Sequence, residues 1–254
     1  MQTAYFISDV HLSLKVKDKE RERRRELFAL LDQVKTEEAT LVIVGDFFDF
    51  YYEWGSVVTA AYMDVYAKLK ELADSGVAIH YLAGNHDFIL GPALSDGIGM
   101  QVYQDAVEIE IAGKRFYCVH GDGLSVNDWK YRRFKRFIRS SFMRFCFRNL
   151  IHPNLGHWIA KQVSYGSRKI SREDDAYMSN LIDENVILAE KVLNQGADYF
   201  ITGHIHLPRL VKMGEKAFLT IGDFLRHFSY GYFDGVNLSL KQWPVKRLNQ
   251  RVLA

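Results

Sequence analysis

Five short clusters of Asp, His and Asn each follow an apolar run of strand length, and this arrangement constrains the fold more than any other feature. Three of the runs lie at residues 3–8, 41–44 and 77–83. Loops at the strand ends of an α/β sheet are where such a fold places its site. Glycine before a polar residue lets the backbone turn sharply, so that the side chain leaves the strand end. The clusters are Asp9-Val10-His11, Gly45-Asp46-Phe47-Phe48-Asp49, Gly84-Asn85-His86-Asp87, His120-Gly121-Asp122 and Gly203-His204-Ile205-His206.

Helix-length amphipathic segments alternate with the runs in the first half of the chain, at 19–34 and 57–72, and this alternation favours an α/β fold. The second half differs. Segments 107–111 and 115–119 flank Gly113 and predict an antiparallel hairpin. Two long helices are predicted next, at 127–150 and 171–194, and a strand follows at 199–202.

Composition excludes several classes of protein. Lys and Arg number 33 against 31 Asp and Glu, so no global charge imbalance points to nucleic acid. No apolar run approaches the roughly 18 residues that span a bilayer, and the first residues lack the features of a secretory signal. Cys118 and Cys146 lie far apart, which is typical of packing thiols in a reduced, cytoplasmic protein.

The residue types in the clusters indicate a metal site. Carboxylates, imidazoles and one amide, without thiolate, suit a hard or borderline divalent ion such as Mn²⁺, Mg²⁺ or Fe²⁺. The clusters hold more ligands than one ion needs. Two ions about 3.5–4 Å apart would use them all, and such a pair holds both oxygens of an in-line phosphoryl displacement.

The five ordered clusters resemble those of the calcineurin-like metallophosphoesterase family over about residues 5–235. The resemblance implies a four-layer α/β/β/α sandwich, as a single domain over 1–254 with a helical cap inserted at about 125–172. It also implies two divalent ions, usually Mn²⁺, whose bound hydroxide attacks phosphorus. One ion would be held by Asp9, His11, Asp46 and His206, and the other by Asp46 as the bridging ligand with Asn85, His120 and His204.

The resemblance gives His86 a different part. In many family members the histidine after the motif asparagine protonates the leaving oxygen or stabilises the transition state, oriented by the aspartate that matches Asp49. A histidine titrates near working pH, which suits that task. The alternative is that His86 packs and Asp49 caps a turn. Asp87 and Asp122 are expected to orient the histidines and the loops.

Segment 129–148 carries eight basic residues and no acidic one, with phenylalanines at helical spacing between them. A basic, aromatic amphipathic helix is typical of an element that lies on an anionic lipid surface. The alternative is a cap helix whose apolar stripe packs on the domain while its charges are solvated, and the two are compatible. Binding of nucleic acid is not expected, because one isolated basic stretch is a smaller basic surface than nucleic-acid-binding proteins usually present.

Within the family, the sequence is similar to the branch that hydrolyses UDP-2,3-diacylglucosamine in lipid A synthesis. The features that carry this likeness are Asp9-Val10-His11-Leu12, Gly45-Asp46-Phe47-Phe48-Asp49, His120-Gly121-Asp122-Gly123-Leu124 with Asp128, and the helical insertion before Gly203. The likeness implies cleavage of the pyrophosphate to UMP and 2,3-diacylglucosamine 1-phosphate (lipid X). It also implies peripheral association with the cytoplasmic face of the inner membrane, with no obligate protein partner. Substrate contacts would come from Asn85, Asp128, Ser164, Ser167, Arg168, Lys169 and His204.

One departure keeps other substrates open. The best-known enzymes of this branch have arginine where this chain has His86, so Gly84-Asn85-His86-Asp87 is the general form of the wider family. Another nucleotide-linked or phospholipid-like phosphodiester, or a soluble diester without acyl chains, is the alternative substrate. A metal-binding scaffold without turnover is the third hypothesis, and the complete motif set stands against it.

Overall fold

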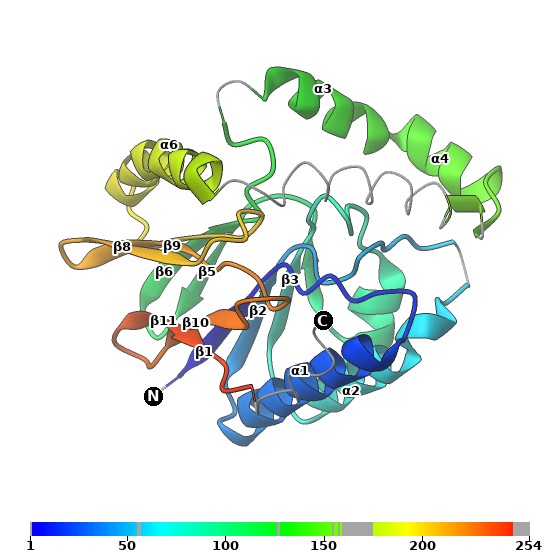
Figure 1. Cartoon of the computed structure of the whole chain (residues 1–254), viewed down its shortest axis with the longest axis horizontal. Helices are drawn as coiled ribbons and strands as arrows, with labels where there is room; N and C mark the ends of the chain where they lie inside the picture. Colours follow the sequence, from blue (N-terminus) through cyan, green and yellow to red (C-terminus); the bar gives the residue numbers. More distant parts are fainter. Residues whose placement is uncertain are drawn as a thin grey trace.

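Two β-sheets lie face to face in the computed structural model, and helices cover the outer face of each sheet (Figure 1). The structure describes residues 2–54, 57–125, 128–153, 155–156, 158 and 175–245. The four layers confirm the α/β/β/α sandwich expected from the sequence. No helix in these described ranges is long and apolar enough to cross a membrane.

The first sheet has the strand order β11-β10-β1-β2-β3-β4. Its members are β1 (Ala4–Ile7), β2 (Thr40–Val44), β3 (Ile79–Leu82), β4 (Gln101–Tyr103), β10 (Ser229–Phe233) and β11 (Leu238–Gln242). Strands β1 to β4 are parallel neighbours. A parallel pair needs a crossover, which α1 (Asp18–Thr36) and α2 (Met63–Asp74) provide. All strand residues of β1, β2 and β3 are buried, as expected of strands covered on both faces.

The second sheet has the order β5-β6-β7-β9-β8. Its members are β5 (Val107–Ile111), β6 (Lys114–Val119), β7 (Tyr199–Thr202), β8 (Arg209–Met213) and β9 (Lys216–Thr220). Strands β5 and β6 form the predicted hairpin. Its two turn residues, Ala112 and Gly113, both have positive φ (49° and 74°), as a tight hairpin turn requires. Helix α6 (Asp175–Asn194) packs on the outer face of this sheet.

The core has three layers of apolar contact. Between the sheets, Phe6 and Val42 of the first sheet belong to one buried cluster with Phe116 and Leu219 of the second. The outer face of the first sheet packs on α1 and α2, and that of the second packs on α6. Alternate residues of one strand thus enter different layers: Phe6 lies between the sheets, while Tyr5 and Ile7 face the helices.

The predicted helix over 57–72 is wrong at its start. Val57 forms an isolated bridge with Trp54, Thr59 has extended backbone, and a 3₁₀ turn, η1 (Ala60–Tyr62), leads into α2. The β-branched residues at 57–59 lose side-chain freedom in a helix, which favours the extended start. A short π-helix, η2 (Ala93–Ile98), was not predicted.

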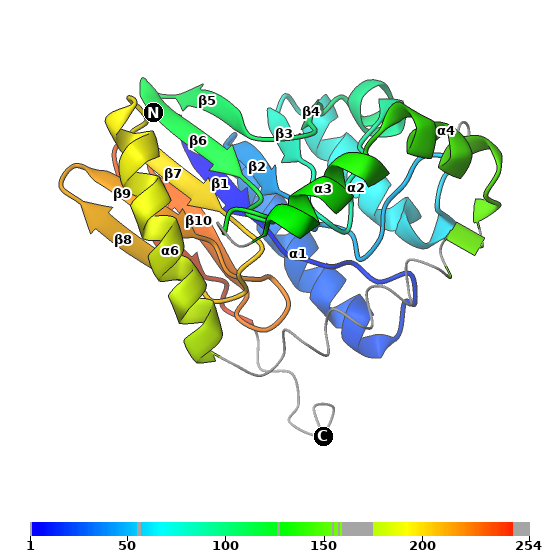
Figure 2. The ribbon, with the colours of Figure 1, turned by 90° about the horizontal axis from the view of Figure 1, so that it is seen from above.

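The predicted helix over 127–150 is in fact two helices, α3 (Trp129–Ile138) and α4 (Ser141–Asn149). The break lies at Ser140, whose backbone is extended and whose Oγ accepts a hydrogen bond from Met143 N at 3.3 Å. A serine that caps a new helix in this way ends the preceding one. In both views α3 and α4 form an arm over the edge of the sheets where β1, β2 and β3 end (Figures 1 and 2).

Candidate metal centre

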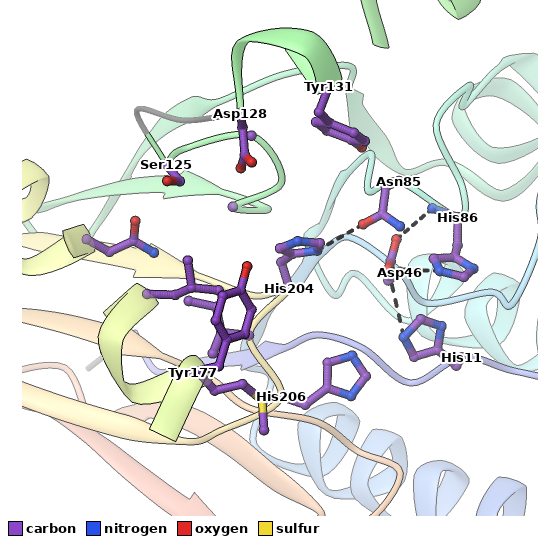
Figure 3. Close-up of a pocket in the computed structure, with 16 residues that line it drawn as sticks. His11, Asp46, Asn85, His86, Ser125, Asp128, Tyr131, Tyr177, His204 and His206 are labelled. Atoms are coloured by element: carbon purple, nitrogen blue, oxygen red, sulfur yellow. Dashed lines mark hydrogen bonds and ion pairs between the residues drawn. The ribbon is translucent and has the colours of Figure 1, made fainter. Parts of the chain in front are cut away.

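The polar clusters of the sequence converge above the ends of five parallel strands. Asp9 and His11 follow β1, Asp46 follows β2, and Asn85 and His86 follow β3. From the second sheet, His120 follows β6, and His204 and His206 follow β7. Figure 3 shows the labelled side chains from both sheets turned toward one another. The structure therefore brings together every described residue that the sequence assigned to metal.

Four of these residues have an unusual backbone. Asp9, His11, Asp46 and His204 all have left-handed φ angles, between 48° and 63°. Non-glycine residues adopt this conformation at an energetic cost, so the surrounding structure must hold them there. Backbone hydrogen bonds from Asp9 N to Gly45 O (3.2 Å) and from His11 N to Asp46 O (3.0 Å) join the first two loops. Strain concentrated in one cluster is typical of a functional site.

The glycines of the clusters serve two purposes. Gly45 has a φ of 78°, which agrees with the sharp turn expected there. At Gly84 and Gly203 the reason is space instead. A Cβ at Gly84 would collide with the Asp46 carboxylate, and one at Gly203 with the Ser8 hydroxyl. Glycine at these positions lets the loops pack closely enough for their side chains to share one site.

One group of ligand atoms is formed by Asp9, His11, Asp46 and His206. The Asp9 Oδ1 atom lies 3.4 Å from His206 Nε2 and 3.7 Å from His11 Nε2. His11 Nε2 also lies 3.8 Å from Asp46 Oδ2. All but His206 are buried. These are the four residues that the family resemblance assigned to one ion.

A second group shares Asp46 with the first. Asp46 Oδ2 lies 3.5 Å from His120 Nε2. Asn85 Oδ1 lies 3.1 Å from His120 Nε2 and 3.0 Å from His204 Nδ1. Asp46 therefore stands between the two groups, in the place expected of a bridging ligand. Its role in holding metal remains a prediction.

The charges of the site favour a cation. Burial alone would lower the pKa of His120, but the neighbouring Asp46 carboxylate raises it to about 10. Burial would also lower the pKa of His206, which the neighbouring Asp223 and Asp9 carboxylates raise to about 10. Two imidazoles that hold protons so firmly indicate an excess of negative charge around them.

The donor set also fits a metal ion. Asp9 Oδ1 is buried and has no hydrogen-bond partner among the described residues. Its ligand atoms and those of His11 and His206 lie within 4.8 Å of one another, and Asp9, Asp46 and His120 satisfy the same limit. A buried carboxylate oxygen without a partner is costly unless a cation neutralises it. Carboxylate, imidazole and amide donors together suit divalent ions.

His86 lies beside these groups. Its Nδ1 is 2.9 Å from the backbone carbonyl oxygen of Asp49, while the Asp49 carboxylate is 4.0 Å from the same nitrogen. The backbone of Asp49, more closely than its side chain, therefore orients the ring. His86 Nε2 is 3.9 Å from Asp46 Oδ2 and faces the site (Figure 3). His11, Asp46 and His86 also form a group within metal-ligand distance, so a ligand role for His86 competes with the acid role.

Asp87 holds the loops in place, as expected, whereas Asp122 contacts α3. Asp87 is fully buried and accepts hydrogen bonds from the backbone amides of Asp46 (3.0 Å), Phe47 (2.7 Å) and Gly84 (2.7 Å). The Asp122 carboxylate instead binds α3 of the cap, accepting from Tyr131 and Lys135 at 2.7–2.8 Å.

Sequence reasoning missed Asp223. Its Oδ2 atom lies 3.4 Å from His206 Nδ1, and Oδ1 accepts from the backbone amides of Arg226 (2.6 Å) and His227 (2.9 Å). The sequence does contain a signal for Asp223, because Gly222-Asp223 follows the apolar strand β9 in the way that Gly45-Asp46 follows β2. Unlike Gly45-Asp46, which Asp49 follows three residues later, Gly222-Asp223 has no second aspartate close behind it, so the sequence marks it less clearly.

A cavity of about 400 Å³ opens over the ligands. The floor of this cavity is formed by His11, Asp46, Asn85 and His204, and the walls come from α3 on one side and α6 on the other. Asp128, an expected substrate contact, lines this cavity at the start of α3, and its side chain makes no capping hydrogen bond. The other expected contacts in the insertion, Ser164, Ser167, Arg168 and Lys169, lie outside the described residues.

Four phenylalanines of α3 and α4 do not pack on the domain: Phe134, Phe137, Phe142 and Phe145 are 56–69% exposed. Phe147 alone packs inward, against the rings of Tyr52 and Trp54. Polar contacts also anchor the helices. Arg139 donates to the carbonyl oxygens of Gln104 and Gly84, and the side chains of Tyr52 and Trp54 donate to carbonyls of α4. The apolar stripe therefore faces outward, and the packed-cap alternative does not describe these rings.

Comparisons with known proteins found several similar chains. The sequence model for calcineurin-like phosphoesterases matches residues 3–208. The UDP-2,3-diacylglucosamine hydrolase of Porphyromonas gingivalis is 32% identical, over 93% of this chain and 96% of its own. The enzyme of that name from Haemophilus ducreyi is 30% identical, over 81% and 85% of the two chains. The structure of an archaeal phosphodiesterase aligns with 94% of this chain and 99% of its own, at 15% identity and a TM-score of 0.48.

Proposed function

The chain belongs to the calcineurin-like phosphoesterase family, and from that premise we propose that it hydrolyses the pyrophosphate of UDP-2,3-diacylglucosamine. The products would be UMP and 2,3-diacylglucosamine 1-phosphate. The observation that carries the proposal is a metal-ligand cluster at the floor of a cavity walled by the cap. The extended similarity to hydrolases of that name supports this substrate over a small phosphodiester.

Two manganese ions are the proposed cofactors. Asp9, His11 and His206 would hold one ion, Asn85, His120 and His204 the other, and Asp46 both. When bound, the ions supply activation of the attacking water and neutralisation of phosphate charge. The chain's own part is to fix these seven side chains on short loops, so that the ligand atoms are in position before substrate arrives.

His86 is proposed to serve the leaving group. Because Nδ1 is directed to the Asp49 carbonyl, Nδ1 carries a proton and Nε2 is the nitrogen available to the substrate. A protonated Nε2 can donate to the leaving oxygen, which is the product phosphate oxygen when the pyrophosphate is cleaved. The backbone contact holds the ring in the orientation that this step needs.

The cap is proposed to meet the lipid. On α3 and α4, exposed phenylalanines alternate with basic residues, and none of the residues 129–148 is acidic. Anionic lipid attracts such a basic face, and the aromatic rings can enter the boundary between headgroups and acyl chains. This surface supports peripheral association with the cytoplasmic face of the inner membrane, where an acylated nucleotide sugar would be presented.

The test is Mn²⁺-dependent turnover of UDP-2,3-diacylglucosamine, with UDP-N-acetylglucosamine and a chromogenic phosphodiester as controls. Rapid UMP release from the acylated substrate alone is expected. Cleavage of the chromogenic diester without the lipid substrate would retain the metal chemistry and move the assignment to another diester, in line with His86 replacing arginine. No turnover of any of the three by manganese-loaded protein would reject the proposal.

A further inference from the structure

The wall of the cavity formed by α6 contains one amide at a position where the helix otherwise presents apolar side chains. Ile182, Asn185, Ala189 and Leu193 form the buried stripe of α6, at helical spacing. The three apolar members pack against Phe200 and Phe218 of the second sheet. Asn185 lies within this stripe, and its side chain is only 5% exposed.

The Asn185 amide has no hydrogen-bond partner among the described residues, and its polar atoms are not fully enclosed, so the amide opens onto the cavity that the residue lines. An apolar residue would complete the buried stripe equally well, so the packing of α6 does not account for an amide here. The neighbours Met178, Leu181 and Ile205 on this wall are apolar, and Tyr177 adds an aromatic ring with a hydroxyl. The wall therefore combines apolar and aromatic surface with two polar groups, of which the Asn185 amide is the one set in the buried stripe of α6.

The wall is held at a fixed distance from the metal ligands. Ser125 Oγ donates to Glu184 Oε2 at 2.7 Å, which joins α6 to the loop after β6. Arg209 of β8 pairs with Asp183 at 3.0 Å. Ile205, which lines the same cavity, lies between the candidate ligands His204 and His206 in sequence. A group bound against α6 is thus placed next to a phosphate at the metal site.

We infer that the α6 wall binds the nucleobase of a nucleoside-phosphate substrate, with Asn185 hydrogen-bonded to the amide-like edge of a pyrimidine. This inference rests on the proposed function and adds a residue that selects the nucleotide half. A carboxamide offers one donor and one acceptor side by side, and the edge of uracil offers the complement. An acyl chain on this wall would leave the amide buried and unpaired, so the chemistry favours the base.

The two substituents of a pyrophosphate leave the metal site in different directions. The α3 wall, with Asp128 and the aromatic cap beyond it, suits an acylated sugar. The opposite wall then receives the nucleoside. A site built to hydrogen-bond a base discriminates against ligands that lack it, because its buried polar group is then left unpaired.

The experiment measures dissociation constants for UMP and ribose 5-phosphate by calorimetry on the manganese-loaded full chain. The two ligands share phosphate and ribose and differ in the base. In the wild-type protein UMP should bind more tightly. Asn185→Leu should weaken UMP about 5- to 150-fold, the range for one buried hydrogen bond, and leave ribose 5-phosphate unchanged. Asn180→Leu, at an exposed position of the same helix, should change neither constant.

Asn185→Ala provides a second variant that cannot overfill the site, and both variants should melt at or above the wild-type temperature. Equal loss of affinity for the two ligands would overturn the inference, as would unchanged UMP binding, which would indicate that Asn185 contacts buried water only. Wild-type protein that binds both ligands equally would also overturn it. The turnover test separates these failures, because hydrolysis of UDP-2,3-diacylglucosamine by wild-type protein would uphold the proposed function in each case.

Discussion

The Asp223 carboxylate lies 3.4 Å from Nδ1 of His206, on the side of the imidazole ring opposite the metal site. The other ring nitrogen, Nε2, lies 3.4 Å from Asp9 Oδ1. A carboxylate in this position fixes the tautomer and the orientation of a metal-binding histidine and increases its basicity. Asp223 is fully buried, so it is held firmly enough to perform this task.

Asp223→Ala is therefore expected to weaken the binding of one metal ion by about 10- to 100-fold. Calorimetric titration of metal-free protein with Mn²⁺ measures this directly, and excess Mn²⁺ should restore much of the lost turnover. Asp234→Ala is the matched control, because Asp234 accepts from the amides of Val236 and Asn237 in an exposed hairpin, away from any histidine. Equal metal affinity in the two variants would contradict the role given to Asp223.

Asp46→Asn should abolish turnover and weaken both metal ions together. The reason is that Asp46 lies between His11 and His120, at 3.8 and 3.5 Å, and is the carboxylate common to both groups of ligands. Metal content after dialysis, measured by atomic absorption, checks the prediction. Asp74→Asn on the exposed end of α2 serves as the control. Full activity with normal metal content in Asp46→Asn would reject the bridging assignment.

His86→Ala should lower kcat by about 10²- to 10⁴-fold while two metal ions remain bound. The prediction depends on His86 Nε2 facing the substrate rather than a metal ion. The competing arrangement, in which His86 joins His11 and Asp46 around one ion, predicts loss of metal instead. Metal content and kcat, measured on the same preparation, decide between the two.

Strand ends and helix faces could be predicted from the sequence because their signals are local. The hairpin of β5 and β6 and the alternation of strands and helices follow from short apolar runs and a turn glycine. Both errors in helix bounds arose where a short local signal interrupts a pattern that otherwise predicts one continuous helix. A single serine, Ser140, ends α3 by capping α4, and the β-branched residues at 57–59 delay α2.

The convergence of the candidate metal ligands could be predicted because each of them lies in a short motif, whereas the residues that support them could not. Asp223 meets His206 only because β9 lies beside β7 in the sheet, a neighbour relation that no sequence spacing expresses. The sequence does not distinguish Asn185 from other polar helix residues, because only the folded chain shows that it lies in the buried stripe of α6. Its importance depends on burial without a partner, which is a property of the folded chain.

The basic face of the cap gives a test of membrane association. Arg133 and Arg136 are exposed, whereas Arg132 and Arg139 donate to backbone carbonyls and support the fold. Arg133→Glu with Arg136→Glu should reduce binding to anionic liposomes at least about tenfold, since each basic residue near the surface contributes about 1 kcal/mol. Sedimentation with liposomes at low and high salt measures the effect, which salt should diminish.

The matched control reverses two exposed arginines on α1, Arg21→Glu with Arg25→Glu, and should bind liposomes as the wild type does. Equal loss in the two double variants would mean that net charge, rather than the cap, determines the binding. Loss that is insensitive to salt would point to the aromatic residues instead.

Those aromatic residues have a separate test, in which Phe134, Phe137 and Phe142 are replaced together by serine. All three rings are more than half exposed, so the substitutions remove no core packing and should leave the melting temperature nearly unchanged. The value of kcat/KM for UDP-2,3-diacylglucosamine should fall at least about tenfold, because a loss of about 1.5 kcal/mol of apolar contact corresponds to that factor. Turnover of a chromogenic diester should persist.

Ile187→Ser with Val236→Ser is the control, since both side chains are also more than half exposed and lie outside the cap. If the control lowers turnover of the acylated substrate as much, general surface hydrophobicity explains the effect. If the triple variant loses both substrates in parallel, the rings support the metal site or the fold. Selective loss of the acylated substrate alone would establish that the outward-facing rings of α3 and α4 meet the acyl chains or the membrane that presents them.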